Sequence, residues 1–135
     1  MTLTDTGPIV SLLDRRQPHH QQYAEVYRRV GSPLLTTWPC FTEAMYLLSE
    51  LKGWSGAQKL WQFWDRKLLL IHEAKIAEHR RMKVLMEKYR DTPMDLADAS
   101  LVAAAEHLGS SRIFTIDSDF YVYRINDREA FEVVP

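Results

Sequence analysis

The sequence predicts an α/β sandwich with a mainly parallel central sheet of four to five strands. Short apolar segments alternate along the chain with longer segments of helical period, which is the pattern of strands joined by crossover helices. No repeat, low-complexity stretch or linker interrupts the 135 residues, so we expect one domain over residues 1–135. A chain of this length buries roughly two thirds of its unfolded surface, which is enough for a core.

Predicted strands and helices alternate in the N-terminal part of the chain. A first strand is expected over residues 1–4, ending at Asp5, and a Gly-Pro turn follows it. A short apolar piece, residues 9–13, leads into a polar turn. A helix is expected from about residue 19 to residue 30, where a Gly-Ser-Pro sequence ends it, and residues 34–37 form the second predicted strand.

The middle of the chain is predicted to be mainly helical. Pro39 suits a first helical turn, and a helix is expected over residues 41–51. A second helical piece follows over residues 56–65. Residues 67–72 form the third predicted strand, and the next helix covers about residues 73–89.

The C-terminal part begins with a helix-start signal at Thr92, an N-cap residue followed by proline. The predicted helix over residues 93–108 ends at Gly109, which suits the position after a helix. Residues 112–116 form the fourth strand and residues 131–134 a last one. Right-handed crossovers between such strands place helices on both faces of the sheet.

The composition excludes several classes of protein. Lys and Arg total 17 against 18 acidic residues, so a protein held to nucleic acid mainly by a general basic excess is excluded, and any such contact needs a local patch. The single cysteine, Cys40, excludes an intramolecular disulfide. We see neither a signal peptide nor an apolar run of about 20 residues, so we expect a cytoplasmic protein without a membrane segment.

Four acidic residues occupy positions that differ from those of ordinary solvated acids. Asp5 and Asp117 each follow a predicted strand, and the carboxyl ends of parallel strands border one crevice. Asp also favours turns, where it bonds its own backbone, so either residue alone is a weak signal. Glu43 is expected in the first turn of its helix among apolar neighbours, either as a functional acid or as a helix-start acid that complements the dipole.

Asp98 is expected in mid-helix among small and aliphatic residues, where an unpaired carboxylate is costly to bury. A cation or a cationic partner would offset that cost. Asp95 lies three residues earlier on the same face, and with Thr92 as N-cap it can also return a capping bond. Carboxylates that converge at one sheet edge favour Mg²⁺ or Mn²⁺ over zinc, and such a site serves phosphodiester cleavage.

The order and spacing of four short motifs resemble the PIN-domain family and, within it, the toxin endoribonucleases of VapBC toxin–antitoxin pairs. The motifs are Leu3-Thr4-Asp5-Thr6-Gly7-Pro8, Thr36-Thr37-Trp38-Pro39 running to Thr42-Glu43-Ala44, Asp95-Leu96-Ala97-Asp98-Ala99-Ser100-Leu101-Val102, and Thr115-Ile116-Asp117-Ser118-Asp119-Phe120. The resemblance implies a PIN-like α/β/α sandwich that acts as a metal-dependent ribonuclease. It also implies a homodimer, an RNA substrate and inhibition by a cognate antitoxin that inserts a peptide near the site.

The resemblance also assigns roles to residues. It makes Asp5, Glu43, Asp98 and Asp117 the catalytic and metal-binding acids. It gives supporting roles to Thr6 and Thr115, whose hydroxyls match positions that orient the carboxylates, and to Asp95 and Asp119, which compete with Asp98 and Asp117 for their places in the motifs.

RNA that approaches an acidic pocket needs basic groups around it. Arg15 and Arg16 follow the first strand-turn unit and are expected near the mouth, and residues 80–90 form the densest basic stretch. Trp54, Trp61 and Trp64 can stack bases, although Trp61 and Trp64, at helical spacing, suit a core or a dimer interface better.

Two further functions remain to be tested. The first is a non-catalytic RNA- or protein-binding module on the same fold, whose acids would bind basic residues of an antitoxin. The second is an aspartic protease, because Asp5-Thr6-Gly7 copies the three-residue signature of that family. That family is all-β, which the long helical segments contradict.

Overall fold

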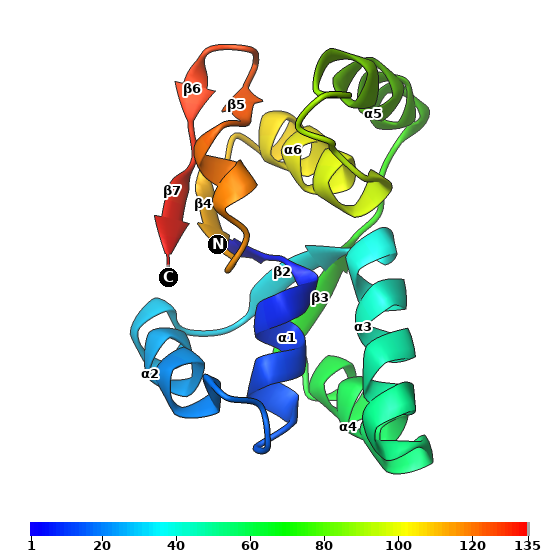
Figure 1. The fold of residues 1–135 in the computed structure, drawn as a ribbon, viewed down its shortest axis with the longest axis vertical. Helices are drawn as coiled ribbons and strands as arrows, with labels where there is room; N and C mark the ends of the chain where they lie inside the picture. The colour runs from blue at the N-terminus through cyan, green and yellow to red at the C-terminus, as the bar shows by residue number, and fades with distance from the viewer. Residues whose placement is uncertain (135) are drawn as a thin grey trace.

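A five-stranded parallel sheet, in the order β3-β2-β1-β4-β7, runs through the centre of the computed structural model, which describes residues 1–134 (Figure 1). Its strands are β1 (Thr2–Thr4), β2 (Leu34–Thr37), β3 (Leu69–His72), β4 (Arg112–Phe114) and β7 (Glu132–Val134). Leu3 of β1 lies opposite Leu35 of β2 on one side and Ile113 of β4 on the other. The predicted α/β class is therefore confirmed, and the all-β protease hypothesis is wrong.

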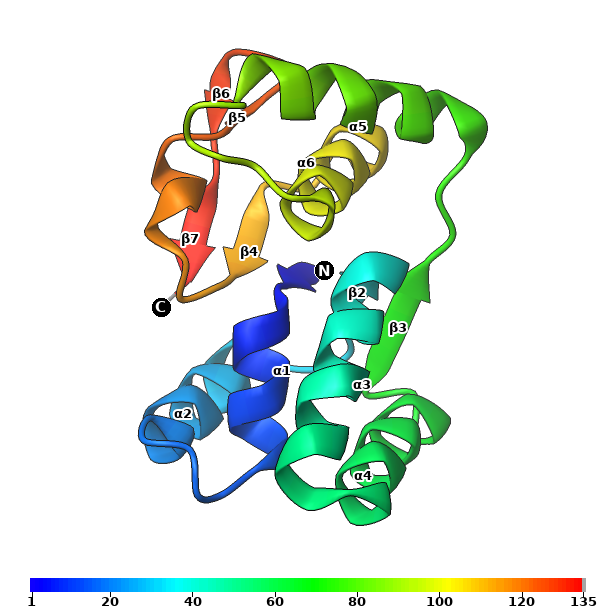
Figure 2. The ribbon, with the colours of Figure 1, turned by 45° about the vertical axis from the view of Figure 1, so that its right-hand side comes forward.

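Helices cover both faces of the sheet (Figure 2). The helices of one layer are α1 (Thr6–Leu13), α2 (His20–Val30), α3 (Trp38–Lys52) and α4 (Trp54–Asp65). The other layer contains α5 (Ile76–Lys88) and α6 (Leu96–Leu108). A 3₁₀ helix (Ser118–Tyr121) and an antiparallel hairpin, β5 (Arg124–Ile125) with β6 (Glu129–Ala130), follow β4. The hairpin was not predicted.

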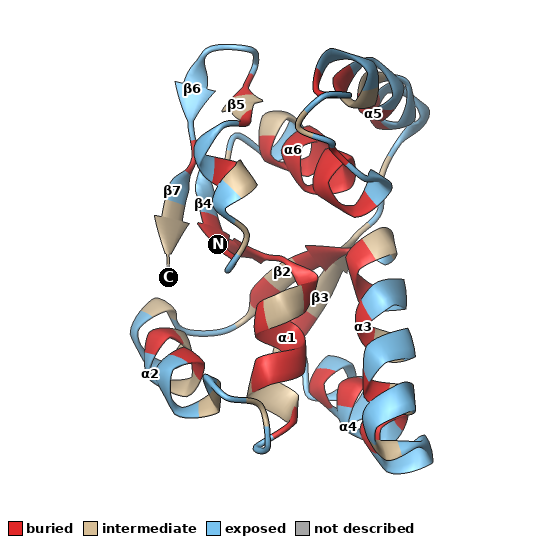
Figure 3. Cartoon of the chain, viewed as in Figure 1, coloured by how far each residue is buried: buried red, intermediate tan, exposed pale blue. Residues whose placement is uncertain are grey.

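Alternation along the strands divides the core between these two layers. Ile113 of β4 packs with α5 and α6, whereas the next residue, Phe114, packs with α1 to α4. Residues 97–105 of α6 are all buried, which explains why this helix shows little amphipathic period in the sequence (Figure 3). Among the described residues, no helix has both the length and the apolar composition needed to cross a bilayer.

The start of α6 differs from the prediction. Thr92 and Met94 donate backbone hydrogen bonds to the carbonyl oxygen of Tyr89, so this segment closes a turn after α5. Asp95 is the N-cap of α6, and its Oδ1 accepts from the backbone N–H of Asp98 at 2.8 Å. The expected N-cap at Thr92 is wrong because the carboxylate three residues later caps the helix. Asp98 consequently lies in the first turn of α6 and not in mid-helix.

Candidate active site

Carboxylate oxygens of Asp5, Asp98 and Asp117 lie within 4.8 Å of one another. Asp5 follows β1 and caps α1, and Asp117 lies after β4 and caps the 3₁₀ helix. Because β1 and β4 are neighbours in a parallel sheet, their carboxyl ends open onto the same crevice. The first turn of α6 adds Asp98 from the opposite layer. The topology thus brings together three of the four predicted catalytic acids.

Hydrogen bonds fix both oxygens of Asp5. Its Oδ1 accepts from the backbone N–H of Thr6 at 2.7 Å, and its Oδ2 accepts from the hydroxyl of Thr115 at 2.9 Å. The same Thr115 oxygen accepts from the backbone N–H of Asp117 at 3.0 Å, so one hydroxyl links two of the acids. Thr6 therefore contacts Asp5 through its backbone N–H, and its hydroxyl donates instead to the carbonyl oxygen of Cys40 at 3.4 Å.

Asp98 is held through one oxygen only. Its Oδ2 accepts from the hydroxyl of Tyr123 at 3.2 Å and from the backbone N–H of Asp95 at 3.3 Å. Within residues 1–134 no donor reaches Oδ1, and that oxygen is not sealed from solvent. The sequence contained no signal for Tyr123, because 25 residues separate it from Asp98 and only the fold joins them.

Asp117 is oriented by the turn that follows it. Its Oδ1 accepts from the backbone N–H of Asp119 at 2.9 Å. Asp119 therefore serves the site through its backbone, and its own carboxylate lies outside the three-acid cluster. Each acid of the cluster is thus held by at least one backbone N–H close to it in sequence.

The cluster carries an electrostatic cost. Burial, followed by the charges of Asp117 and Asp95, raises the pKa of Asp5, despite the hydrogen bonds from Thr6 and Thr115. Burial and then the charge of Asp95 raise the pKa of Asp98 to about 7. Among the described residues, no Lys, Arg or His forms an ion pair with the three acids. A bound cation would offset this repulsion.

The chemistry of the donor set fits a hard divalent cation. All three groups offer carboxylate oxygens, which suit Mg²⁺ or Mn²⁺, whereas zinc prefers His and Cys. The single thiol of the chain, that of Cys40, lies 3.9 Å from Oδ1 of Asp5. Burial and the charge of Asp5 raise the pKa of this thiol to about 12, so it stays protonated and is a poor metal ligand.

The sequence profile of the PIN domain matches residues 2–126. The chain belongs to the PIN-domain family. No curated protein sequence gives a significant match. Several solved structures share the fold, and three of them are below 20% identical in sequence, so their likeness concerns the fold.

VapC20 of Mycobacterium tuberculosis, a toxin that cleaves the sarcin–ricin loop, has a TM-score of 0.82 at 14% identity and covers 90% of this chain and 94% of its own. A toxin–antitoxin complex from Klebsiella pneumoniae has a TM-score of 0.64 at 18% identity, covering 89% and 90%. VapBC2 of Rickettsia felis, bound to a DNA fragment from its promoter, has a TM-score of 0.69 at 14% identity, covering 99% and 98%.

Glu43 of this PIN domain lies at the rim of the site. It is the sixth residue of α3, and its side chain is exposed, so its expected place in a first turn among core residues is wrong. The helix begins at Trp38, earlier than the sequence indicated. Glu43 and Asp95 line a cavity of about 710 Å³ together. Desolvation by the neighbouring protein, and then the charges of Asp95 and Asp5, raise the pKa of Glu43.

The basic residues predicted near the mouth lie elsewhere in this PIN domain. Asp5 caps the N-terminus of α1 and Asp14 its C-terminus, and eight residues of helix span about 12 Å. Arg15 and Arg16 follow Asp14, at the end of α1 away from the acids. Arg16 donates to Oδ1 of Asp14 at 3.3 Å and to the carbonyl oxygen of Leu51 at 3.1 Å. The expected position of both arginines is therefore wrong.

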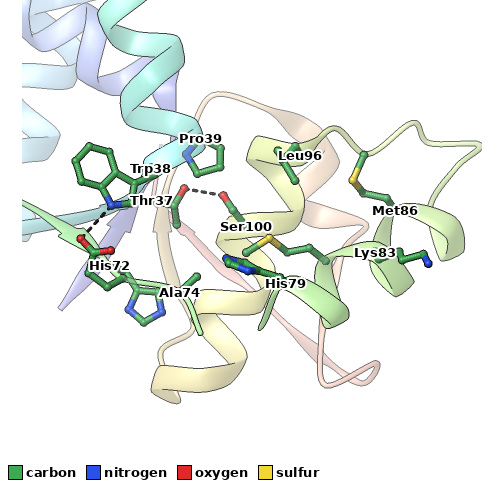
Figure 4. A pocket seen from close by; sticks show the side chains of 12 residues that line it. Thr37, Trp38, Pro39, His72, Ala74, His79, Lys83, Met86, Leu96 and Ser100 are labelled. Carbon is green, nitrogen blue, oxygen red and sulfur yellow. Dashed lines mark hydrogen bonds between the residues drawn. The ribbon is translucent and has the colours of Figure 1, made fainter. Parts of the chain in front are cut away.

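A largely apolar cavity of about 670 Å³ lies beside the rim, between the start of α3, α5 and α6 (Figure 4). The hydroxyls of Thr37 and Ser100 face each other in its wall at 2.6 Å. Trp38 closes one side, where its indole N–H donates to Oε1 of Glu73 at 3.0 Å. None of the three clustered aspartates lines this cavity. It is a neighbouring surface and not the acidic site itself.

Proposed function

We propose that this PIN domain is a metal-dependent endoribonuclease that hydrolyses RNA phosphodiester bonds, as the toxin of a type II toxin–antitoxin pair. One observation carries the proposal, namely the close approach of carboxylate oxygens from Asp5, Asp98 and Asp117 within a PIN fold. Similarity to VapC20, which cleaves the sarcin–ricin loop, supports RNA as the substrate class. The carboxylate donor set favours Mg²⁺ or Mn²⁺ as the cofactor.

In this proposal Asp5, Asp98 and Asp117 hold the cation. A divalent cation held by these residues would supply Lewis-acid chemistry, namely activation of water and stabilisation of charge on the phosphate oxygens. The protein contributes the geometry. Thr115 orients Asp5, and Asp98 keeps Oδ1 open because its other oxygen is engaged by Tyr123 and Asp95. Glu43 completes the acidic set from the rim.

The partners and the setting belong to the same proposal. The solved relatives include toxin–antitoxin assemblies, and we infer that a cognate antitoxin inhibits this chain as well. We also propose that residues 1–135 act as one domain, that the chain forms a homodimer, and that it acts on RNA in the cytoplasm.

A cleavage assay on the full chain tests the proposal. Labelled structured RNAs are incubated with the protein in Mg²⁺, in Mn²⁺ and in EDTA. We expect metal-dependent cutting that Asp98→Asn lowers at least 100-fold, whereas Asp65→Asn, which changes an exposed acid at the end of α4, cuts normally. Thermal denaturation checks that both variants are folded. Undiminished turnover by Asp98→Asn would refute the assignment, and the absence of metal binding in calorimetry would refute the metal site.

A further inference from the structure

A cavity of about 220 Å³ directly adjoins the acidic site on the side of Asp117. Thr115 and Asp117 belong both to this cavity and to the hydrogen-bonded set of the cluster. The segment after β4, orange in Figure 1, forms one wall through Ile116 and Tyr121, and α2 contributes Gln22. The proposed function leaves this cavity unassigned. A group bound in it would lie against Asp117.

The lining of the cavity suits a planar ring. Tyr121 and Ile116 are 62% and 55% exposed, so much of an aromatic residue and of an apolar residue remains open to a ligand. The amide of Gln22 and the hydroxyl of Ser118 can donate or accept hydrogen bonds. The volume lies below the roughly 300–1,000 Å³ of drug-sized pockets, so the cavity suits a smaller group.

The cavity is unsuited to a phosphate group. No Lys, Arg or His is among the described residues that line it, and Asp117 gives it negative charge. A different cavity of this protein, lined by Arg15, His20 and Arg28 together with Glu25, does contain basic groups. An uncharged group with hydrogen-bonding edges therefore fits the cavity beside Asp117 better than an anion.

Contacts outside the cavity hold its walls in place. A Cβ built on Gly7 would lie 2.9 Å from Cδ1 of Ile116, so this side chain packs closely over the first turn of α1. The carbonyl oxygen of Tyr121 accepts from the guanidinium of Arg124 at 2.9 Å. Because Asp5 caps the helix that carries Gly7, the cavity and the acidic cluster share one framework.

We propose that this cavity binds one nucleobase of the RNA, from a nucleotide that flanks the bond to be cut. Tyr121 stacks on the face of the base, and Gln22 hydrogen-bonds its edge. Proteins read single-stranded RNA in this manner, by stacking unpaired bases on aromatic rings and bonding their edges. The inference rests on the proposed function, and it adds that the enzyme selects its cleavage site through one base position.

Cleavage of a random-sequence RNA pool, with sequencing of the new ends, tests the selection. We expect wild type to prefer certain bases at one position beside the cut, and Tyr121→Ala to weaken that preference about tenfold. Tyr121→Phe, which keeps the ring, and Trp54→Ala, which removes an exposed ring from α4, should retain it. A cleavage profile that is the same in wild type and Tyr121→Ala would overturn the proposal.

A binding measurement separates this inference from the proposed function. Short RNAs carrying the fluorescent base 2-aminopurine at successive positions are titrated with protein in EDTA, where no cutting occurs. We expect wild type and Tyr121→Phe to quench the fluorescence of 2-aminopurine at one position of the RNA. Tyr121→Ala should quench it several-fold less. If wild type cuts no RNA but this quenching is present, the base site stands and the nuclease proposal fails. Equal fluorescence with wild type and Tyr121→Ala at every position would refute the base site.

Discussion

The hydroxyl of Tyr123 donates a hydrogen bond to Oδ2 of Asp98 at 3.2 Å, from a side chain with no exposed surface. The rings of Phe120 and Tyr89 pack edge-to-face against Tyr123, each with centroids 5.1 Å away. Burial, and then the charge of Asp98, raise the pKa of the Tyr123 phenol, so it remains a donor at every pH of interest. A rigid, protonated group thus holds one oxygen of Asp98.

Tyr123→Phe should weaken metal binding while leaving the fold intact. The substitution removes only the hydroxyl, so the Asp98 carboxylate can rotate and its ligating oxygen is less well placed. Loss of a group that orients a metal ligand costs about 10–100-fold in affinity or activity. We expect a drop of about tenfold in affinity for Mn²⁺, measured by titration calorimetry.

Tyr89→Phe is the matched control for that variant. Tyr89 is also buried and aromatic, but its hydroxyl accepts from the backbone N–H of Arg124 at 3.1 Å and touches none of the acids. We expect a loss of about 1 kcal/mol in unfolding free energy and an unchanged metal affinity. If both variants bind Mn²⁺ equally well, Tyr123 has no positioning role.

Thr115→Val should uncouple two of the acids. The hydroxyl of Thr115 donates to Asp5 and accepts from the backbone of Asp117, and valine replaces it with a methyl group of similar size. We expect RNA cleavage to fall about 10–100-fold. Thr36→Val is the control, because its buried hydroxyl donates to the carbonyl oxygen of Thr4 and not to a carboxylate. Similar cleavage rates for the two variants would argue against an orienting role for Thr115.

The affinity for divalent cations should depend on pH near neutrality. The pKa of Asp98 is raised to about 7, so below that pH the carboxyl group of the metal-free protein is largely protonated. A cation must displace this proton, and the apparent affinity should therefore fall up to tenfold for each unit below pH 7 and level off above it. Calorimetry in Mn²⁺ at pH 5.5 to 8 measures this slope. A flat profile would contradict a protonated Asp98.

The stability of the metal-free protein should change in the opposite direction. The pKa of Asp98 is about 7 in the folded state and about 3.8 in an unfolded chain, so the folded state holds more protons between about pH 4 and pH 7. The stabilisation is complete below pH 3.8 and is lost as pH rises through 7. We expect Asp98→Asn to flatten this fall in urea denaturation between pH 5 and 8. A wild-type curve as flat as that of the variant would refute the expectation.

The sequence allowed Asp5 and Asp117 to be found, because their positions follow from strand ends in a parallel sheet. Asp98 was also identified as a costly acid, but its helix was predicted to begin too early, since Thr92-Pro93 looks like a helix start and in fact closes a turn. With the helix start placed at Thr92, the reciprocal capping between Asp95 and Asp98 is not predicted. The residue types near a helix start do not decide between two N-cap candidates, here Thr92 and Asp95, when both suit the position.

Contacts between residues far apart in the sequence could not be predicted from strand ends and helix caps. The bond from Tyr123 to Asp98 depends on how the chain after β4 folds back over α6. The position of Arg15 depends on whether residues 9–13 continue a helix that begins at Thr6, and α1 does carry Arg15 away from the acids. Both cases depend on the path of the chain in space, and hydrophobic periodicity along the sequence does not determine that path.

Gly56→Ala should destabilise the protein although alanine favours helices. A Cβ at this position, near the start of α4, would lie 2.1 Å from the carbonyl oxygen of Leu48 in α3, and a backbone atom cannot move aside as a side chain can. The propensity gain is about 1 kcal/mol, whereas forced overpacking costs about 1–3 kcal/mol and more against backbone, so the clash should decide the sign. We expect a net loss of about 1–2 kcal/mol in urea denaturation. Ser55→Ala, at the exposed neighbouring position, is the control and should be neutral or slightly stabilising. A stabilised Gly56→Ala would refute the clash between this Cβ and the backbone of α3.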